Sequence, residues 1–63
     1  MDHADRFAKL RHDLANPLSG MLAEVQLMLL RADELDAEVT EGLRMIEQLA
    51  LRMRVMLRET VTG

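Results

Sequence analysis

One short stretch of this sequence carries residues that could do chemistry together, and it runs from Arg11 to Gly20. His12 offers an imidazole, and the carboxylate of Asp13 follows it directly. Asn16 comes one helical turn later and is followed by Pro17. An exposed histidine is more often a plain polar surface residue than a reactive one, and on an ideal helix Asp13 points about 100° away from His12. Whether His12 is reactive or a plain polar surface residue therefore depends on how the surrounding helices position it.

The composition favours a small helical protein and excludes several function classes. The chain has 63 residues, no cysteine and a net charge of −3. Its basic residues form no continuous stripe and aromatic residues for base stacking are almost absent, which argues against nucleic-acid binding. The longest apolar run, Leu27–Leu30, falls far short of the ~20 residues of a membrane span, and no signal-peptide pattern opens the chain. We therefore expect a soluble, cytoplasmic domain without membrane contact.

A chain of this length is expected to need a second copy for stability. Such a monomer buries only about 60 % of the surface that its unfolded chain exposes. Small folds compensate with disulfides, a metal or oligomerisation, and the missing cysteines exclude disulfides and thiolate metal sites. His3 and His12 lie on different turns and faces of a helix, so we expect no metal site. Oligomerisation is the remaining expectation.

Residues 2–31 are predicted to form one helix, because apolar residues recur there at spacings of three and four. They are Phe7, Leu10, Leu14, Leu18, Met21, Leu22, Val25, Met28 and Leu29. Around Pro17 the spacing is four plus four, which is a stutter of the heptad. Pro17 also removes the hydrogen bond to the carbonyl of Asp13, so we expect the helix to bend just after His12.

Residues 32–36 are predicted to form a short connection, and residues 37–60 a second helix. Asp36 suits the N-cap of this helix and Glu38 its first turn. The apolar residues of the second helix form a regular heptad seam with two flanking members. The seam is Val39, Leu43, Ile46, Ala50, Met53 and Leu57, and the flank is Leu49 and Met56.

Two helices joined by a short connection predict an all-α fold, an antiparallel helical hairpin that forms one domain over residues 1–63. A single hairpin exposes half of its apolar stripe, so two hairpins are expected to pair into a homodimeric four-helix bundle. The width of the stripe, more than two positions per heptad, also favours a bundle of four helices over a two-stranded coil.

The side chains on the outer face of the first helix form an unusual stripe. At about 100° per residue, His12 lies roughly 150° from the apolar face, and Asn16 lies within about 40° of His12. Ser19, Ala23 and Leu27 continue the same line, so small side chains and then an apolar one follow the histidine. Such a track predicts a docking surface for another protein. The alternative is that Leu27 belongs to the wide edge of a buried stripe.

The segment His12-Asp13-Leu14-Ala15-Asn16-Pro17-Leu18 resembles the H-box of sensor histidine kinases, H-[ED]-x-x-[NT]-P-L. The likeness extends to Phe7, five residues before the histidine, and to the downstream aliphatic positions, and it covers essentially the whole chain. The chain is therefore similar to a dimerisation and histidine-phosphotransfer domain of a two-component system.

This resemblance implies a role for each residue of the motif. His12 would be the phosphoacceptor and attack the γ-phosphoryl group of ATP through Nε2, while Asp13 would bind Nδ1 and keep Nε2 nucleophilic. Asn16 would place a water molecule for dephosphorylation of a partner's aspartyl phosphate, and Pro17 would supply a bend. A response regulator receiver domain would dock on Ser19, Ala23 and Leu27.

The chain lacks the Gly-rich ATP-binding boxes of the histidine kinase family. We therefore expect that it binds no cofactor itself, that ATP and Mg²⁺ act through a separate ATP-binding domain, and that it cannot phosphorylate itself. Phosphate would enter at His12 and leave to an aspartate of the response regulator. Two alternatives stay open, a stand-alone histidine phosphotransferase of a phosphorelay and a purely structural dimerisation hairpin. The H-x-x-K-G phosphorelay motif is disfavoured, because Ala15 and Asn16 occupy its Lys-Gly positions.

Overall fold

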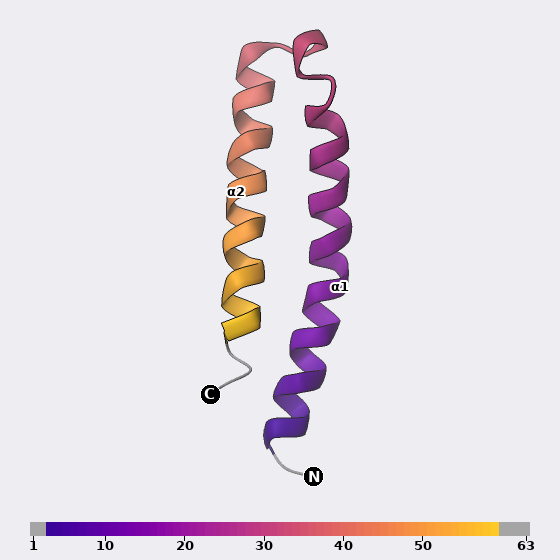
Figure 1. The fold of residues 1–63 in the computed structure, drawn as a ribbon, viewed down its shortest axis with the longest axis vertical. Helices are drawn as coiled ribbons and strands as arrows, with labels where there is room; N and C mark the ends of the chain where they lie inside the picture. The colour runs from indigo at the N-terminus through magenta and orange to yellow at the C-terminus, as the bar shows by residue number, and fades with distance from the viewer. Residues whose placement is uncertain (1–2, 60–63) are drawn as a thin grey trace.

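The computed structural model describes residues 3–59, and in them the chain folds into an antiparallel helical hairpin. Helix α1 spans His3–Leu29, a short 3₁₀ helix η1 spans Ala32–Glu34, and helix α2 spans Ala37–Glu59. The two long helices lie side by side, with the first turn of α1 and the last turn of α2 at the same end of an elongated molecule of 50 × 16 × 12 Å (Figure 1). The predicted all-α hairpin is confirmed.

Helix α1 keeps its helical backbone through Pro17, and its buried residues follow the helical repeat. Leu18, Leu22 and Val25 are buried at spacings of four and three, which places them on one line facing α2. In Figure 1 the first turns of α1 are inclined to the turns that follow. Pro17 lies inside α1, where its ring lacks an N–H and crowds the carbonyl of Asp13, and the bend predicted at this residue stays a prediction.

Helix α1 ends at Leu29, two residues before the predicted end at residue 31. The reason is a tightening of the last turn. The N–H of Leu30 is shared between the carbonyls of Gln26 at 3.2 Å and Leu27 at 3.3 Å, and the N–H of Arg31 bonds to the carbonyl of Met28 at 3.0 Å. The N–H of Glu34 then bonds to the carbonyl of Arg31 at 2.9 Å and continues this pattern into η1. The predicted short connection contains this 3₁₀ turn.

Helix α2 begins at Ala37, as predicted, and Asp36 precedes it at the N-cap position. The backbone carbonyl of Asp36 accepts the first helical hydrogen bond, from the N–H of Thr40 at 2.9 Å. The hydroxyl of Thr40 also lies 3.5 Å from the carbonyl of Ala32 and ties α2 to η1. Glu38 lies in the first turn, where a negative charge is favourable. The predicted first residue of α1, Asp2, and last residue of α2, Thr60, lie outside the described residues.

The core between the two helices is narrow. Leu18, Leu22 and Ala50 form one buried cluster, against which Leu57 packs, and Leu22 is only 1 % exposed. The small side chain of Ala50 allows the helices to approach each other at this level. Farther along, the amide of Gln26 donates a hydrogen bond to Oε2 of Glu47 at 3.2 Å, which connects α1 and α2 on the surface.

Most of the residues predicted for the core face are exposed in the single hairpin. They are Phe7, Leu10, Leu14, Met21 and Met28 on α1, and Val39, Ile46, Leu49, Met53 and Met56 on α2. On a helical projection of α1, the exposed apolar residues that follow Phe7 lie about 50–90° to one side of the line of buried residues. On α2 the exposed apolar residues lie about 30–130° to one side of the buried residues of that helix. In an antiparallel pair both offsets point to the same side, so these residues form one continuous face, here called the apolar face.

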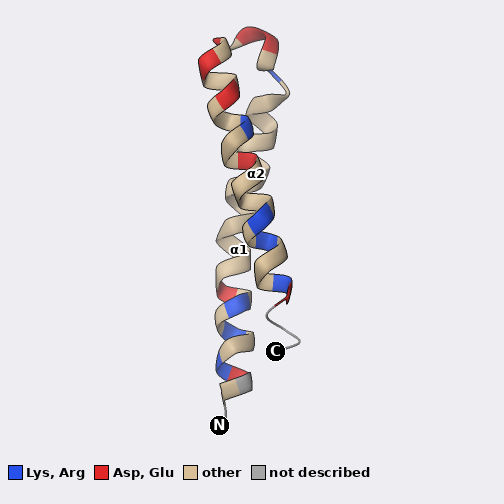
Figure 2. Cartoon of the chain, turned by 90° about the vertical axis from the view of Figure 1, so that its left-hand side faces the viewer, with Lys and Arg blue, Asp and Glu red and all other residues tan. Residues whose placement is uncertain are grey.

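Charge is distributed unevenly along the hairpin (Figure 2). Residues 21–47, at the end with the connection, hold seven acidic and two basic side chains, whereas residues 3–20 and 48–59 hold six basic and three acidic ones. The end that carries His12 is therefore positive and the connection is negative. Within residues 3–59 neither long helix has the run of apolar residues that crossing a bilayer would require.

Candidate functional site

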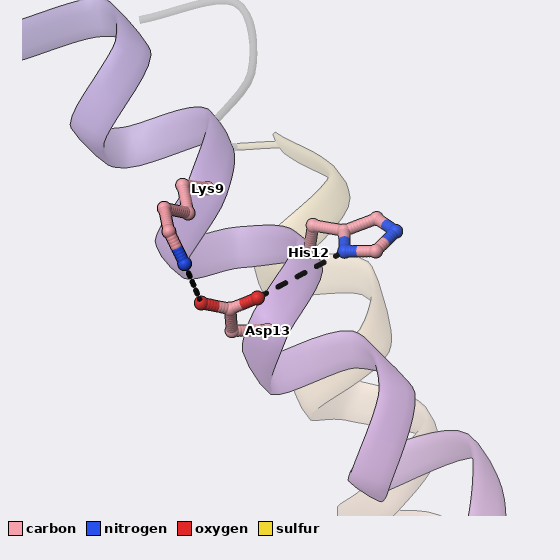
Figure 3. Close-up of polar contacts among 3 residues, drawn as sticks. All are labelled: Lys9, His12 and Asp13. Carbon is pink, nitrogen blue, oxygen red and sulfur yellow. Dashed lines mark hydrogen bonds and ion pairs between the residues drawn. The ribbon is translucent and has the colours of Figure 1, made fainter.

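His12 lies on the outer side of α1, where its side chain is 75 % exposed. Figure 3 shows the ring projecting away from the helix, with Nδ1 turned toward Asp13 and Nε2 outward. Among the described side chains, the first buried one on α1 is Leu18, six residues farther on. The imidazole is therefore presented by a helix that does not bury it, and Nε2 is open to an approaching group.

Asp13 lies between His12 and Lys9 (Figure 3). Its Oδ1 is 4.0 Å from Nδ1 of His12, and its Oδ2 is 2.9 Å from Nζ of Lys9. The distance to His12 is longer than an N–H···O hydrogen bond, at about 2.7–3.2 Å, and small enough for a side-chain rotation to close it. The structure thus brings the carboxylate to the imidazole, although ideal helix positions alone do not.

Lys9 is the residue near this site that sequence reasoning missed. The signal was present, since a basic and an acidic residue four positions apart are neighbours on a helix surface. Lys9 lies one turn before Asp13, and the hydrogen bond between them is short. The structure adds that the same carboxylate has Nζ of Lys9 at one oxygen and Nδ1 of His12 near the other.

Asn16 and Pro17 are both exposed on the same uninterrupted helix as His12. Because α1 stays helical from His12 to Asn16, the two side chains are vertical neighbours, about 40° apart in projection. Pro17 leaves the backbone carbonyl of Asp13 without its usual helical donor. The structure therefore places an amide beside the imidazole and a backbone irregularity directly beyond it.

Below the histidine, Ser19, Ala23 and Leu27 are exposed, as the outward stripe predicts. Leu27 is 59 % exposed and Leu30 is 79 % exposed, so neither belongs to the core of the hairpin. An open hollow of about 460 Å³ at this end of α1 is lined by Glu24, Leu27, Met28, Leu30, Arg31 and Leu35. The stripe therefore runs from the imidazole to an accessible apolar hollow near the connection.

Helix α2 contributes apolar surface on this side as well, which sequence reasoning also missed. Leu51 and Val55 are exposed and line a second hollow of about 370 Å³ together with Arg52 and Met56. In projection Leu51 and Val55 lie on the side of the hairpin that carries Ser19, opposite to the apolar face. Their spacing of four, outside the heptad seam, was the available signal.

The arrangement can hold a nucleophilic imidazole, with a carboxylate on one nitrogen and free access to the other. In residues 3–59 no three His, Asp or Glu side chains are grouped so that they could hold a metal ion. What the site offers is an exposed nitrogen nucleophile on a helix surface.

Comparison with known proteins agrees with this geometry. The family described as His Kinase A (phospho-acceptor) domain matches residues 3–62, which is nearly the whole chain. A search of curated proteins and a search of solved structures found no match to the chain. The family match spans both helices and the His12 motif, and the chain belongs to the His Kinase A (phospho-acceptor) domain family.

Proposed function

We propose that this chain is the phosphoacceptor and dimerisation domain of a two-component sensor histidine kinase and that His12 is the phosphorylated residue. Domains of this family have the phosphoacceptor and dimerisation role in histidine kinases, which are transferases. The observation that carries the assignment to His12 is its exposed imidazole, with Nδ1 at 4.0 Å from the Asp13 carboxylate and Nε2 facing outward.

In the proposed reaction, the lone pair of His12 Nε2 attacks the γ-phosphorus of ATP held by a separate catalytic domain. The bond from the γ-phosphorus to the bridging oxygen breaks, and ADP leaves. The ring becomes positively charged until the Nδ1 proton is lost, and the carboxylate of Asp13 stabilises that charge. Asp13 also favours the tautomer that carries the proton on Nδ1 and leaves Nε2 free to react.

The second step passes the phosphoryl group to a response regulator. A receiver aspartate attacks the phosphorus, and the N–P bond to His12 breaks with its electron pair returning to Nε2. The ring takes up one proton from solvent in this step, so that it leaves as a neutral imidazole. Docking supplies the alignment for this displacement. Such docking is supported by the exposed stripe of Ser19, Ala23 and Leu27. The small side chains of Ser19 and Ala23 follow His12 along α1 and allow a second protein to come close to the helix.

Asn16 is proposed to act in a separate reaction, in which a water molecule hydrolyses the aspartyl phosphate of the receiver and releases inorganic phosphate. Its amide can donate to a water molecule and accept from it one helical turn from His12. Pro17 is proposed to let the first turns of α1 change their inclination relative to the core, because it interrupts the backbone hydrogen bonds there.

The apolar face is proposed to bind the apolar face of a second copy. Ten large apolar side chains exposed on one hairpin would be costly in water, and pairing two hairpins removes them from it. Two copies related by a two-fold axis would bury the same residues on both sides and leave each His12 outside.

The proposal is tested by incubating the chain with ATP, Mg²⁺ and the ATP-binding domain of a histidine kinase. We expect an acid-labile, base-stable phosphate that is lost in His12→Gln and retained in the matched control His3→Gln. Transfer of this phosphate to a receiver domain supports the two-component role. If His12→Gln is phosphorylated like the unmodified chain, the assignment fails, and a chain that only dimerises is a structural hairpin.

A further inference from the structure

The carboxylate of Asp13 has two partners that use different oxygens. Oδ2 accepts a hydrogen bond from Nζ of Lys9 at 2.9 Å, and Oδ1 faces Nδ1 of His12 at 4.0 Å (Figure 3). One oxygen is therefore held while the other is left for the imidazole. Lys9 precedes His12 by three residues and Asp13 by four, so all three side chains lie within one turn of α1.

The Lys9–Asp13 pair contributes little to folding. The Lys9 side chain is 78 % exposed and that of Asp13 is 53 % exposed, and exposed ion pairs are weak because water screens them. Neither residue lies among the buried residues of the hairpin. Any consequence of the pair must therefore come from where it holds the carboxylate.

The Lys9–Asp13 hydrogen bond orients the carboxylate of Asp13 toward Nδ1 of His12. An unrestrained aspartate side chain on a helix surface samples several rotamers, and Asp13 starts about 100° away from His12 in projection. The hydrogen bond from Lys9 to Oδ2 selects an orientation in which Oδ1 points to the imidazole. Side chains on a helix also lean toward its N-terminus, which brings the ring of His12 over the turn that carries Lys9.

We propose that Lys9 is a positioning residue for the phosphorylation of His12. It fixes the Asp13 carboxylate so that Oδ1 accepts the hydrogen bond from Nδ1–H, which keeps the Nε2 lone pair available. This inference rests on the proposed function of His12 and adds a residue outside the H-box motif. Lys9 acts through Asp13 and touches none of the reacting atoms.

The positive charge of Lys9 acts against this positioning effect, because it draws negative charge away from Oδ1 and weakens the attraction between Oδ1 and the imidazole. At an exposed site this charge effect is small, because the surrounding water screens it. The orientation effect is not screened, since it depends on which rotamer the side chain occupies. Removing Lys9 is therefore expected to slow the reaction rather than to speed it.

The test compares Lys9→Met, Lys9→Arg and the control Arg6→Met in the full chain. Lys9→Met keeps the length of the side chain without its charge, and Lys9→Arg keeps the charge and a donor for Oδ2. We expect Lys9→Met to lower the rate of His12 phosphorylation about threefold to fivefold, the size of effect typical for an exposed pair. Lys9→Arg should restore most of the rate, and Arg6→Met should leave it unchanged.

A second readout needs neither ATP nor a catalytic domain. The ¹⁵N chemical shifts of the His12 ring report which nitrogen carries the proton, and Lys9→Met should increase the share of the tautomer protonated on Nε2. In an Asp13→Asn background Lys9→Met should have no further effect on rate or shifts. Unchanged shifts and rate in Lys9→Met, or an effect of Lys9→Met that persists in the Asp13→Asn background, would overturn the proposal. If His12 is not phosphorylated at all, the proposed function fails while the ring shifts still test the positioning by Lys9.

Discussion

Nδ1 of His12 and Oδ1 of Asp13 lie 4.0 Å apart, although the two residues are neighbours in sequence and diverge on an ideal helix. The approach depends on side-chain rotamers, because the helix backbone separates the two Cβ directions by about 100°. The pair is therefore close without being locked, and a modest rotation of either side chain makes or breaks the hydrogen bond. This loose coupling is where substitutions should act most strongly on the proposed chemistry.

Asp13→Asn is expected to lower the rate of His12 phosphorylation by at least about tenfold. The amide has no negative charge to stabilise the ring during attack, and it can turn either its NH₂ or its oxygen toward Nδ1. The measurement is the initial rate of phosphate incorporation from ATP with a histidine kinase ATP-binding domain. Glu24→Gln, which neutralises another exposed carboxylate of α1, is the matched control and should retain the full rate. Equal rates for Asp13→Asn and the unmodified chain would remove Asp13 from the mechanism.

Asn16→Ala is expected to reduce dephosphorylation of a receiver domain severalfold and to leave phosphorylation of His12 nearly unchanged. The amide is proposed to hold the attacking water, a role that the forward reaction does not need. Both rates are measured on the same protein preparation, the first as loss of aspartyl phosphate from the receiver. A parallel loss of both activities would mean that Asn16 supports the helix or the imidazole instead.

Ile46→Glu is expected to convert the proposed dimer to a monomer. Ile46 lies in the middle of the apolar face, and pairing would bury the new carboxylate without a partner. Sedimentation at several protein concentrations gives the oligomeric state. The control is Gln48→Glu, which adds a negative charge on the opposite side of α2 and should leave the dimer intact. A dimer that survives Ile46→Glu would show that another surface pairs the hairpins.

Leu22→Ala is expected to lower the free energy of unfolding by about 2–5 kcal/mol. Leu22 is the most completely buried of the large described side chains, and its loss leaves a cavity between α1 and α2. Leu30→Ala removes the same atoms from an exposed position and should change stability by less than about 0.5 kcal/mol. Both are measured by denaturant unfolding at one protein concentration. Similar losses for the two variants would contradict the observed core.

Ala23→Arg is expected to slow transfer from phosphorylated His12 to a receiver domain by about tenfold or more. Ala23 lies about three turns from His12 on the proposed docking stripe, and a long charged side chain there would obstruct the approach of a receiver domain. Ala23→Ser keeps the side chain small and serves as the control. Phosphorylation of His12 itself should be the same in both variants, and unimpaired transfer in Ala23→Arg would place the docking surface elsewhere.

The helices, their pairing and their seam could be predicted because they depend on the spacing of apolar residues and on Asp36 as an N-cap. Ala50 and Leu43 are buried as the heptad of α2 predicts. The end of α1 could not be placed to the residue, since the tightened turn at Leu30 and Arg31 breaks no pattern of polarity. Apolar periodicity also does not separate residues buried within one hairpin from those left for a second copy.

The sequence predicts which residues make up the candidate site, but it does not predict the distances between their side chains. His12, Asp13 and Asn16 follow from the motif and from helix geometry. The distance between His12 and Asp13, and the hold of Lys9 on the carboxylate, depend on side-chain rotamers at exposed positions. Sequence spacing constrains such rotamers only weakly, so the structure was needed to connect Lys9 with the imidazole.

The place where burial begins along α1 has a consequence for how the molecule opens. Among the described side chains of α1, the fully buried ones start at Leu18, directly after Pro17 interrupts the ladder of backbone hydrogen bonds. Resistance to local opening depends on burial, so backbone amides from His3 to Asn16 should exchange with deuterium well before those around Leu22. We therefore expect the hairpin to open in two steps, with the turns that present His12 opening before the core around Leu22 does.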